Sequence, residues 1–226
     1  MSSTPDPATP AGASAPSEQS EREAAAPSVE IPVPTGEVRL LSAVQRRLLR
    51  VPGSREAAVL LSHVGEHALG WMAVAGAGMV LDPARRGRWA MVGVGTFGAH
   101  ATSVAVKRVV RRRRPAHPSV TVGVGTPSTL SFPSSHATST TAFALLAGAV
   151  SGVPIAPALV PLMSASRLVL GVHYPSDVLA GVAVGTGCAA FTRAAWPTEL
   201  VQRVLPESLR DAATGPGAAE NPEEKR

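Results

Sequence analysis

The sequence predicts an all-α fold, a helical membrane bundle of about five transmembrane helices with an N-terminal amphipathic surface helix. Three observations support this fold class. Five apolar stretches follow one another with short connections, and several approach the roughly 20 residues that span a bilayer. The chain has 21 glycines and only 4% aromatic residues, a composition that lets membrane helices pack closely. A basic, amphipathic segment precedes the first stretch.

The two ends of the chain are predicted to be polar tails. Residues 1–36 contain seven prolines and many Ser, Ala and Thr, which is typical of a disordered segment. Residues 196–226 are similarly polar, and no cleavable signal peptide is recognisable at the N-terminus. Because the chain has 21 Lys and Arg and 16 Asp and Glu, of which the first tail holds one and five, the remainder carries +9. Such a charge suits nucleic acid, a membrane surface or an anionic substrate.

Residues 37–56 form the predicted basic amphipathic helix. Its apolar residues recur at helical spacing, namely Leu40, Leu41, Val44, Leu48 and Val51. Its basic residues largely occupy the other side, namely Arg39, Arg46, Arg47 and Arg50. This pattern predicts a helix lying on an anionic lipid surface or, as an alternative, a helix packed on the rest of the protein. Pro52 and Gly53 then break the chain.

Residues 57–195 form the predicted membrane domain. Its five apolar stretches are residues 57–81, 89–106, 137–151, 154–170 and 177–194. With five spans in series, the connection between the second and third helices lies on the same face as the connection between the fourth and fifth. Polar motifs that are far apart in the chain can therefore meet at this face.

The first motif is Lys107 followed by Arg114-Pro115, in the pattern K-x6-R-P. Seven residues are close to two helical turns, so both cations can point to one side if the helix continues to Pro115. A lysine charge and an arginine fork suit the oxygens of a phosphoryl group. The alternative for this basic run is a solvated, lipid-facing or nucleic-acid-binding segment.

The second motif, Pro133-Ser134-Ser135-His136, directly precedes an apolar stretch. Its position predicts a helix N-terminus, where free backbone N–H groups favour an anion. Ser134 offers a hydroxyl donor, and His136 can give a proton to a leaving oxygen. The alternative is an ordinary serine cap with a structural histidine.

The third motif joins Ser166-Arg167 to His173 and Asp177, in the pattern S-R-x5-H-x3-D. An arginine at the edge of a membrane helix is costly unless it is paired, which favours a functional role. A carboxylate that holds one imidazole nitrogen leaves the other free to attack. The alternative is a capping or structural pair at the start of the next helix, which Pro175 is well placed to open.

Taken in order, the three motifs resemble the signature of the type 2 phosphatidic acid phosphatase family, which also includes vanadium haloperoxidases and bacterial lipid and prenyl phosphate phosphatases. The resemblance covers about residues 57–195. One position departs from the pattern, because the family usually has glycine where this chain has Ser135. That change affects the expected geometry of the loop.

The resemblance implies a metal-independent phosphoric monoester hydrolase that needs no cofactor. His173 would be the nucleophile that forms a phosphohistidine, Asp177 would orient it, and His136 would protonate the leaving oxygen and later activate water. The groups expected to bind phosphate oxygens are Lys107, Arg114, Ser134, the Ser135 amide and Arg167.

A further pattern, His63-Val-Gly-Glu66-His67, matches the H-x-x-E-H arrangement of some zinc proteases. No third ligand accompanies it in the sequence, and Gly65 weakens a helix there. We therefore expect a polar entrance to the first membrane helix that lines the mouth of the active site. His100 and His117 are expected to be structural or solvated.

The expected partners are a lipid or prenyl phosphate substrate and the bilayer, with no nucleic acid. Within the family, the short bundle with its basic extension resembles the actinobacterial decaprenylphosphoryl-5-phosphoribose phosphatases. Undecaprenyl pyrophosphate, phosphatidylglycerophosphate and phosphatidic acid are alternative substrates. Two other classes remain, a haloperoxidase and a non-enzymatic protein that binds anionic lipid.

The expected location is the plasma membrane of a high-GC bacterium. The face that carries the motifs also carries more Lys and Arg than the opposite face. The positive-inside rule therefore predicts an active site on the cytoplasmic side.

Overall fold

The computed structural model describes residues 33 and 35–196, so most of both predicted tails lies outside the described residues. The chain divides into Met1–Val33 and Pro34–Arg226, and the second unit contains all the helices described here. Its described part is helical without a strand, and an isolated bridge joins Arg113 to Leu130. The elements are α2 (Gly36–Leu48), α3 (Ser54–Val64), η1 (Glu66–Ala68), α4 (Leu69–Leu81), η2 (Pro83–Arg85), α5 (Arg86–Val110), α6 (Ser135–Ser151), α7 (Ala156–Val169) and α8 (Pro175–Ala195).

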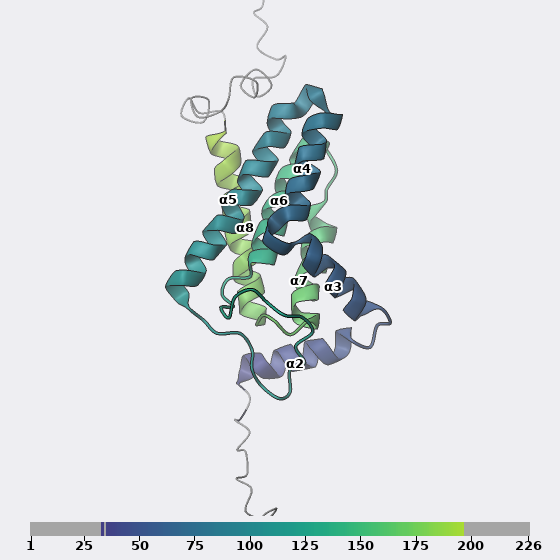
Figure 1. The fold of residues 1–226 in the computed structure, drawn as a ribbon, viewed down its shortest axis with the longest axis vertical. Helices are drawn as coiled ribbons and strands as arrows, with labels where there is room; N and C mark the ends of the chain where they lie inside the picture. The colour runs from purple at the N-terminus through teal and green to yellow at the C-terminus, as the bar shows by residue number, and fades with distance from the viewer. Residues whose placement is uncertain (1–32, 34, 197–226) are drawn as a thin grey trace, which may run out of the picture. The chain divides into compact units, whose positions relative to one another are not determined.

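The body of this unit is a bundle in which α4, α5, α6 and α8 run alongside one another, while α3 packs on α7 (Figure 1). Its main core lies between these helices and contains the stacked rings of Trp71 and Phe143, whose centroids are 4.8 Å apart. The Trp71 indole N–H donates to the Thr140 hydroxyl at 3.0 Å, which satisfies a polar group inside the core. Helix α6 is therefore enclosed by its neighbours.

Small residues allow α8 to approach α6 closely. A Cβ atom added to Gly181 would lie 2.7 Å from the Ser134 carbonyl oxygen, and one added to Gly185 would overlap the Thr138 carbonyl. Close backbone approach of this kind is how membrane helices gain packing without a large apolar side chain. Since α6 and α8 begin with the second and third motifs, this packing also fixes the distance between the motifs.

The first expected span, residues 57–81, is broken in the structure. Helix α3 ends at Val64, and the pair formed by α3 and η1–α4 bends by 50°. His67 and Ala68 have positive φ values of 49° and 61°, a conformation that L-residues seldom adopt. A Cβ at Gly65 would lie 2.7 Å from His136 Cδ2 and 3.0 Å from Met163 Cε, so only glycine fits here. The break thus brings the chain against His136.

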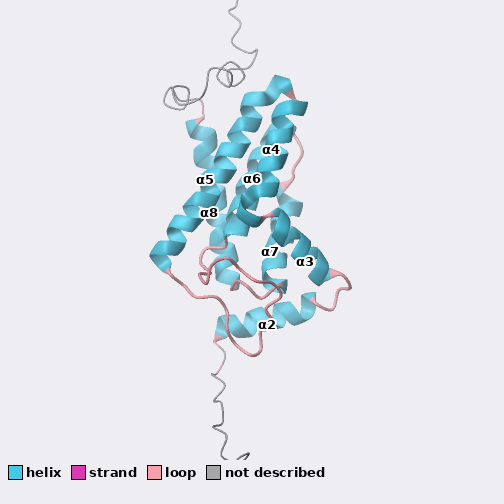
Figure 2. Cartoon of the chain, in the orientation of Figure 1, coloured by secondary structure: helices cyan, strands magenta, loops and turns pink. Residues whose placement is uncertain are grey.

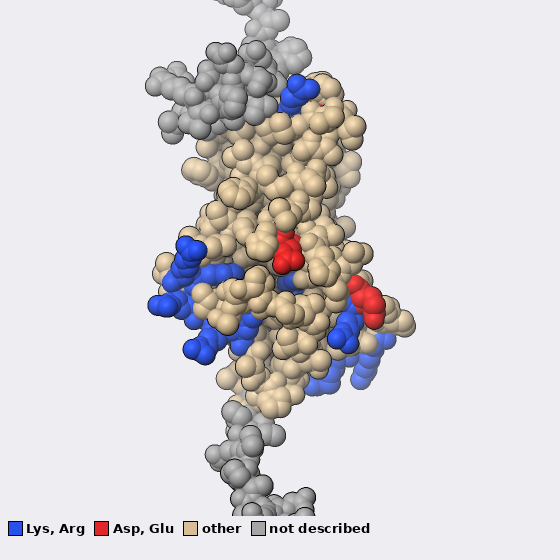
Figure 3. Space-filling model, viewed as in Figure 1, with Lys and Arg blue, Asp and Glu red and all other residues tan. Residues whose placement is uncertain are grey.

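Among the described residues, one helix has the length and composition of a membrane span, and a bent pair of helices could form a second. Among the described residues, α8 is long and apolar enough to cross a bilayer, and the bent pair of α3 and α4 passes the same test together. Helix α7 is a shorter apolar helix. On the face seen in Figure 3, Lys and Arg gather towards the end of the bundle that carries α2, and the belt above them has few charged groups. Such a belt suits a lipid environment.

Helix α2 crosses the lower end of the bundle (Figure 1), and its inner side packs on protein. Val38 and Leu41 are buried there, and the Gln45 amide nitrogen donates to the carbonyls of Thr121 at 2.7 Å and Val169 at 2.9 Å. The arginines of α2 are exposed on its other side, at positions 39, 46 and 47. The helix therefore rests on the connections between spans and presents positive charge outwards.

We predict that Gly185→Val destabilises the bundle, because the added side chain collides with the backbone of α6 at Thr138. Overpacking of this kind costs about 1–3 kcal/mol, measurable as a lower midpoint of thermal unfolding in detergent. The matched control is Gly187→Val in the same helix, since a Cβ there meets nothing within 4 Å. Equal stability of the two variants would contradict this account of α6–α8 packing.

Candidate active site

Two connections between helices meet at one end of the bundle, as the topology predicts. The long loop between α5 and α6 lies over this end (Figure 2), beside the short loop between α7 and α8. The Gly123 N–H donates to the Leu170 carbonyl and the Ser134 N–H to the Asp177 carbonyl, each at 2.9 Å. These bonds bring the three motifs together although they are far apart in the chain.

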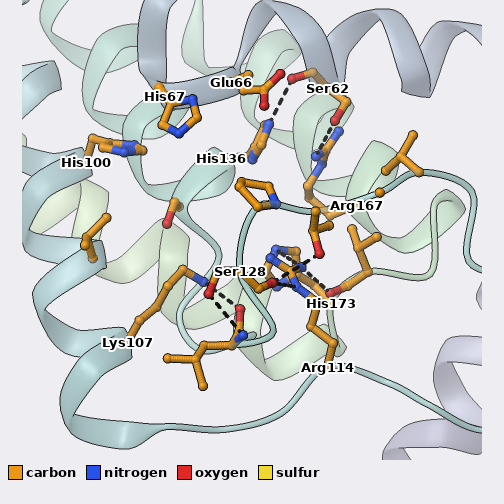
Figure 4. A pocket seen from close by; sticks show the side chains of 18 of the residues that line it. Ser62, Glu66, His67, His100, Lys107, Arg114, Ser128, His136, Arg167 and His173 are labelled. Atoms are coloured by element: carbon orange, nitrogen blue, oxygen red, sulfur yellow. Dashed lines mark hydrogen bonds between the residues drawn. The ribbon is translucent and has the colours of Figure 1, made fainter.

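A cavity of about 640 Å³ opens beside these loops (Figure 4). Six of the eight residues expected from the sequence line it, namely Lys107, Arg114, Ser135, His136, Arg167 and His173. The other two, Ser134 and Asp177, are fully buried behind it. The six expected residues that line the cavity thus include three cations and two imidazoles, which suits a phosphate group.

His173 occupies the centre of this arrangement, with its side chain 3% exposed. Its Nε2 atom lies 3.2 Å from Arg114 Nη1, and its Nδ1 atom lies 3.6 Å from Asp177 Oδ2. Because a guanidinium only donates, Nε2 must be the accepting nitrogen, and the proton is on Nδ1 facing the carboxylate. The lone pair of Nε2 is therefore on the cationic side of the ring.

The protonation state of His173 suits a nucleophile. Burial lowers the pKa of this imidazole to about 4, although the neighbouring Asp177 carboxylate acts to raise it. The ring is then neutral at physiological pH, and its Nε2 lone pair is available for attack.

Asp177 serves both the local fold and His173. As the third residue of α8 it closes a capping box with Tyr174, whose N–H donates to Asp177 Oδ2 at 2.8 Å. Pro175 opens the helix, as predicted. The side chain of Asp177 is completely buried, so the carboxylate needs a cation partner as well as hydrogen bonds.

That cation is Arg112, which the sequence did not single out. Its Nη1 atom donates to Asp177 Oδ1 at 2.9 Å and to the Ser176 hydroxyl at 2.6 Å, while Nη2 pairs with Glu37 of α2. The guanidinium also lies over the Tyr174 ring, 4.0 Å from its centroid. Arg112 therefore links the carboxylate behind His173 to the first turn of the surface helix.

Alternate residues in the run from Arg111 to Arg114 face opposite sides and have different roles. Helix α5 ends at Val110, because Arg111 adopts a left-handed conformation with φ of 55°, and the following backbone is extended. In extended backbone successive side chains point to opposite sides; Arg112 and Arg114 face inwards and are partly buried, whereas Arg113 is exposed. The condition that one helix continues from Lys107 to Arg114 is therefore not met.

The structure brings Lys107 and Arg114 to the same cavity by way of the loop. Lys107 Nζ donates to three backbone carbonyls, of Leu130 at 3.3 Å, Ser131 at 3.2 Å and Pro133 at 2.7 Å. The Arg114 guanidinium donates to the carbonyls of Ser128 at 2.8 Å and Val172 at 2.7 Å. Both cations thus fix the loop while they line the cavity.

Ser62 of α3 orients two of the expected site residues and was also missed from the sequence. Its carbonyl oxygen lies 3.0 Å from His136 Nε2, and its hydroxyl accepts from Arg167 Nη1 at 3.1 Å. A carbonyl only accepts, so His136 carries a proton on Nε2, and its Nδ1 atom is the nitrogen that Ser62 does not contact. No sequence motif includes Ser62. The closest feature that could have pointed to it is Gly65, where a break in the helix could be expected.

The two serines of the second motif differ in position. Ser134 is the N-cap of α6, where its hydroxyl accepts the Ala137 N–H at 3.4 Å, as one of the alternatives for this motif proposed. Its donation to phosphate stays a prediction. Ser135 lines the cavity, and its hydroxyl lies 2.8 Å from that of Ser103 in α5. The hydroxyl of Ser135, at a position where the family usually has glycine, therefore has a hydrogen-bond partner within the protein.

The H-x-x-E-H residues line the other side of the same cavity, as expected for a polar entrance. His63, Glu66 and His67 border it together with His100 of α5. Within the described part of the chain, no three His, Cys, Asp or Glu residues are grouped so that they could hold a metal ion. The zinc-protease pattern is therefore not matched by a zinc-binding geometry.

A helical bundle whose loops surround a neutral, carboxylate-backed histidine with three cations has the features that the three motifs predict for a phosphatase. Residues 88–200 match the PAP2 superfamily, and the chain belongs to this family. It is a phosphatase, as the signature motifs predicted.

Curated relatives and one solved structure agree with this assignment. The chain is 58% identical over 148 residues to a decaprenylphosphoryl-5-phosphoribose phosphatase of Mycolicibacterium smegmatis, a match that covers 66% of this chain and 82% of the relative. It is 54% identical over 157 residues to the protein of that name from Mycobacterium tuberculosis, covering 70% and 89%. A transmembrane PAP2 type phosphatidylglycerolphosphate phosphatase from Bacillus subtilis has the same fold, with a TM-score of 0.56, 21% identity, and coverage of 76% of this chain and 90% of that chain.

We predict that Arg112→Gln lowers kcat by about tenfold to a hundredfold, the usual loss when a partner of an active-site group is removed. The reason is that Asp177 would lose its cation and hold the His173 ring less firmly. Phosphate release at saturating substrate measures the effect, and Arg112→Lys should restore part of it because the charge remains.

The matched control is Arg113→Gln, whose side chain is exposed next to Arg112. It should leave kcat unchanged. Equal losses in the two variants, or wild-type activity in Arg112→Gln, would show that Arg112 does not position Asp177.

Proposed function

We propose that this phosphatase hydrolyses the phosphomonoester of a prenyl-linked sugar phosphate, decaprenylphosphoryl-5-phosphoribose. The observation that carries the proposal is the neutral His173, whose Nε2 lone pair faces Arg114 in a cavity that Lys107 and Arg167 also line. The relatives that share 54–58% identity support this substrate by their names. The cavity is also large enough for more than a phosphate group.

In the first step of the proposed mechanism, His173 Nε2 attacks phosphorus and the bond to the ester oxygen breaks. The phosphoryl group moves to His173. His136 enters this step as an imidazolium with a proton on each ring nitrogen; the leaving alkoxide takes the Nδ1 proton, and His136 is left neutral with its Nε2 proton on the Ser62 carbonyl. Asp177 stabilises the proton that stays on His173 Nδ1. Arg114, Lys107, Arg167 and the Ser135 amide face the charge on the phosphoryl oxygens.

In the second step, His136 removes a proton from water, and the hydroxide formed attacks the phosphorus of phosphohistidine. The P–N bond breaks, inorganic phosphate leaves, and the electron pair returns to His173 Nε2. Both steps use only groups of the chain itself, and we propose that the reaction needs no metal ion.

We predict that His173→Ala lowers phosphate release by at least about a thousandfold, because removal of a nucleophile costs this much or more. The measurement is inorganic phosphate released from decaprenylphosphoryl-5-phosphoribose in detergent micelles, with and without a metal chelator. The chelator should leave the wild-type rate unchanged.

The matched control is His117→Ala, since this histidine is outside the cavity lining. Undecaprenyl pyrophosphate, phosphatidylglycerophosphate and phosphatidic acid form the comparison set of substrates. Faster hydrolysis of one of these would reassign the substrate, and wild-type activity in His173→Ala would overturn the nucleophile.

We also propose that the chain crosses the bacterial plasma membrane five times, with the active site at the cytoplasmic face. The spans would be the bent pair of α3 and α4, then α5, α6, α7 and α8, between polar tails at residues 1–36 and 196–226. The support is the positive charge at the end of the bundle that carries α2 and the site (Figure 3). In this arrangement the arginines on the outer side of α2 face anionic lipid headgroups.

Reporter fusions test this orientation. A reporter that is active only in the cytoplasm should work at the N-terminus, and one that is active only outside should work after Arg226 and between α4 and α5 at Asp82. The opposite pattern would place the site on the outer face, and matching signals at both termini would exclude an odd number of spans.

A further inference from the structure

The cavity has a second half that the phosphate chemistry does not use. Its lining includes His63, Glu66 and His67, which lie at or beside the break between α3 and α4, and His100 of α5. Figure 4 shows the rings of His67 and His100 near each other; their centroids are 6.0 Å apart. The four side chains come from three elements, α3, η1 and α5, and border the same cavity.

These side chains have unused hydrogen-bonding capacity. The Glu66 carboxylate lies 4.0 Å from His63 Nδ1, which is longer than a hydrogen bond. His100 Nδ1 is buried and has no hydrogen-bond partner among the described residues. A buried polar atom without a partner is uncommon in a native protein, and a ligand group in the cavity would supply one.

The backbone at this place is strained. His67 and Ala68 both adopt positive φ values, of 49° and 61°, and strain of this kind concentrates at functional sites. The strain bends the chain so that Glu66 and His67 border the cavity. A regular helix through residues 57–81 would have turned them to other sides.

The charge of this half differs from that of the phosphate half. Lys107, Arg114 and Arg167 are the cations expected to bind phosphate, and Arg108 is a fourth cation of the lining, whereas the residues at the break between α3 and α4, together with His100, contribute imidazoles and one carboxylate. A carboxylate accepts hydrogen bonds from neutral hydroxyl groups, and an imidazole both donates and accepts. This composition suits the hydroxyls of a sugar and disfavours a second phosphate close to Glu66.

The position of His136 shows which part of a substrate would reach this half. His136 is the group placed to protonate the leaving oxygen, so the remainder of the leaving group must extend past it. Figure 4 shows Glu66 and His67 on the side of His136 away from His173, with His100 next to His67. Together the two halves give about 640 Å³, within the range of cavities that hold a small-molecule ligand.

We infer that Glu66, His67 and His100 form a subsite that binds the hydroxyl groups of the sugar in the leaving group. The inference rests on the proposed function, because it assumes a sugar phosphate substrate. The carboxylate of Glu66 accepts the sugar hydroxyls, and the two histidines complete the polar surface. The subsite thereby distinguishes a phosphorylated sugar from a plain prenyl phosphate.

The test compares two substrates in wild-type protein and in Glu66→Gln. For decaprenylphosphoryl-5-phosphoribose, kcat/KM should fall by about tenfold to a hundredfold, as expected when hydrogen bonds to a charged group are lost. For decaprenyl monophosphate, which has no sugar, kcat/KM should change by less than about twofold on the same principle, since no such bond is made. His67→Asn, which tolerates the left-handed backbone, should show the same selective loss.

Glu56→Gln is the matched control, because this glutamate lies on α3 and is absent from the lining of the cavity. A further substrate, whose ribose lacks the 2- and 3-hydroxyls, allows the carboxylate and the hydroxyls to be removed separately and together. Wild-type protein should lose activity on it, and Glu66→Gln should lose no more.

The outcomes separate the subsite from the substrate assignment. If wild-type protein hydrolyses the sugar phosphate and Glu66→Gln affects both substrates equally or neither, the subsite is overturned and the proposed function stands. If wild-type protein hydrolyses decaprenyl monophosphate but releases no phosphate from the sugar phosphate, both are overturned.

Discussion

The buried carboxylate of Asp177 is the interaction on which the site depends. It caps α8 through the Tyr174 N–H, faces His173 Nδ1 and pairs with Arg112. A buried carboxylate without such partners would cost several kcal/mol, so the helix start, the loop and the histidine are held in one arrangement. Through Arg112 the same network reaches Glu37 of α2. Helix α2 is therefore linked to His173 through these charged groups.

The broken first helix gives the site its second half. Because the chain bends at Gly65, Ser62 contacts both His136 and Arg167, and the residues after the break border the same cavity. A straight membrane helix would present one side to the site and place only every third or fourth residue there. The bend supplies both the orientation of the proton donor and a polar surface for the leaving group, at the expense of two strained residues.

Burial explains how a very basic protein keeps a neutral nucleophile. Four cations line the cavity, and the enclosed position of His173 favours its uncharged form. The cations also find carbonyl partners in the loops, as Lys107 does with three of them. Lys107 and Arg114, which would bind a phosphate, therefore also stabilise the loop between α5 and α6, whose carbonyls they contact. Small residues in α6 and α8 complete this framework, since close packing of these helices sets the spacing of the motifs they carry.

The sequence by itself determined the helical class, the family and the residues of the three motifs, because these depend on residue type and on spacing near helix ends. It did not determine which of four consecutive arginines serves the carboxylate, or that Ser62 orients His136. Those contacts join residues 65 and 74 positions apart, so they follow from how the helices pack and from where α5 ends. Helix α5 stops at Val110 and Arg111 turns the chain, and this local conformation sends Arg112 to Asp177 and Arg114 to the cavity. Tertiary packing decided those roles, because identical side chains differ only in the direction the backbone gives them.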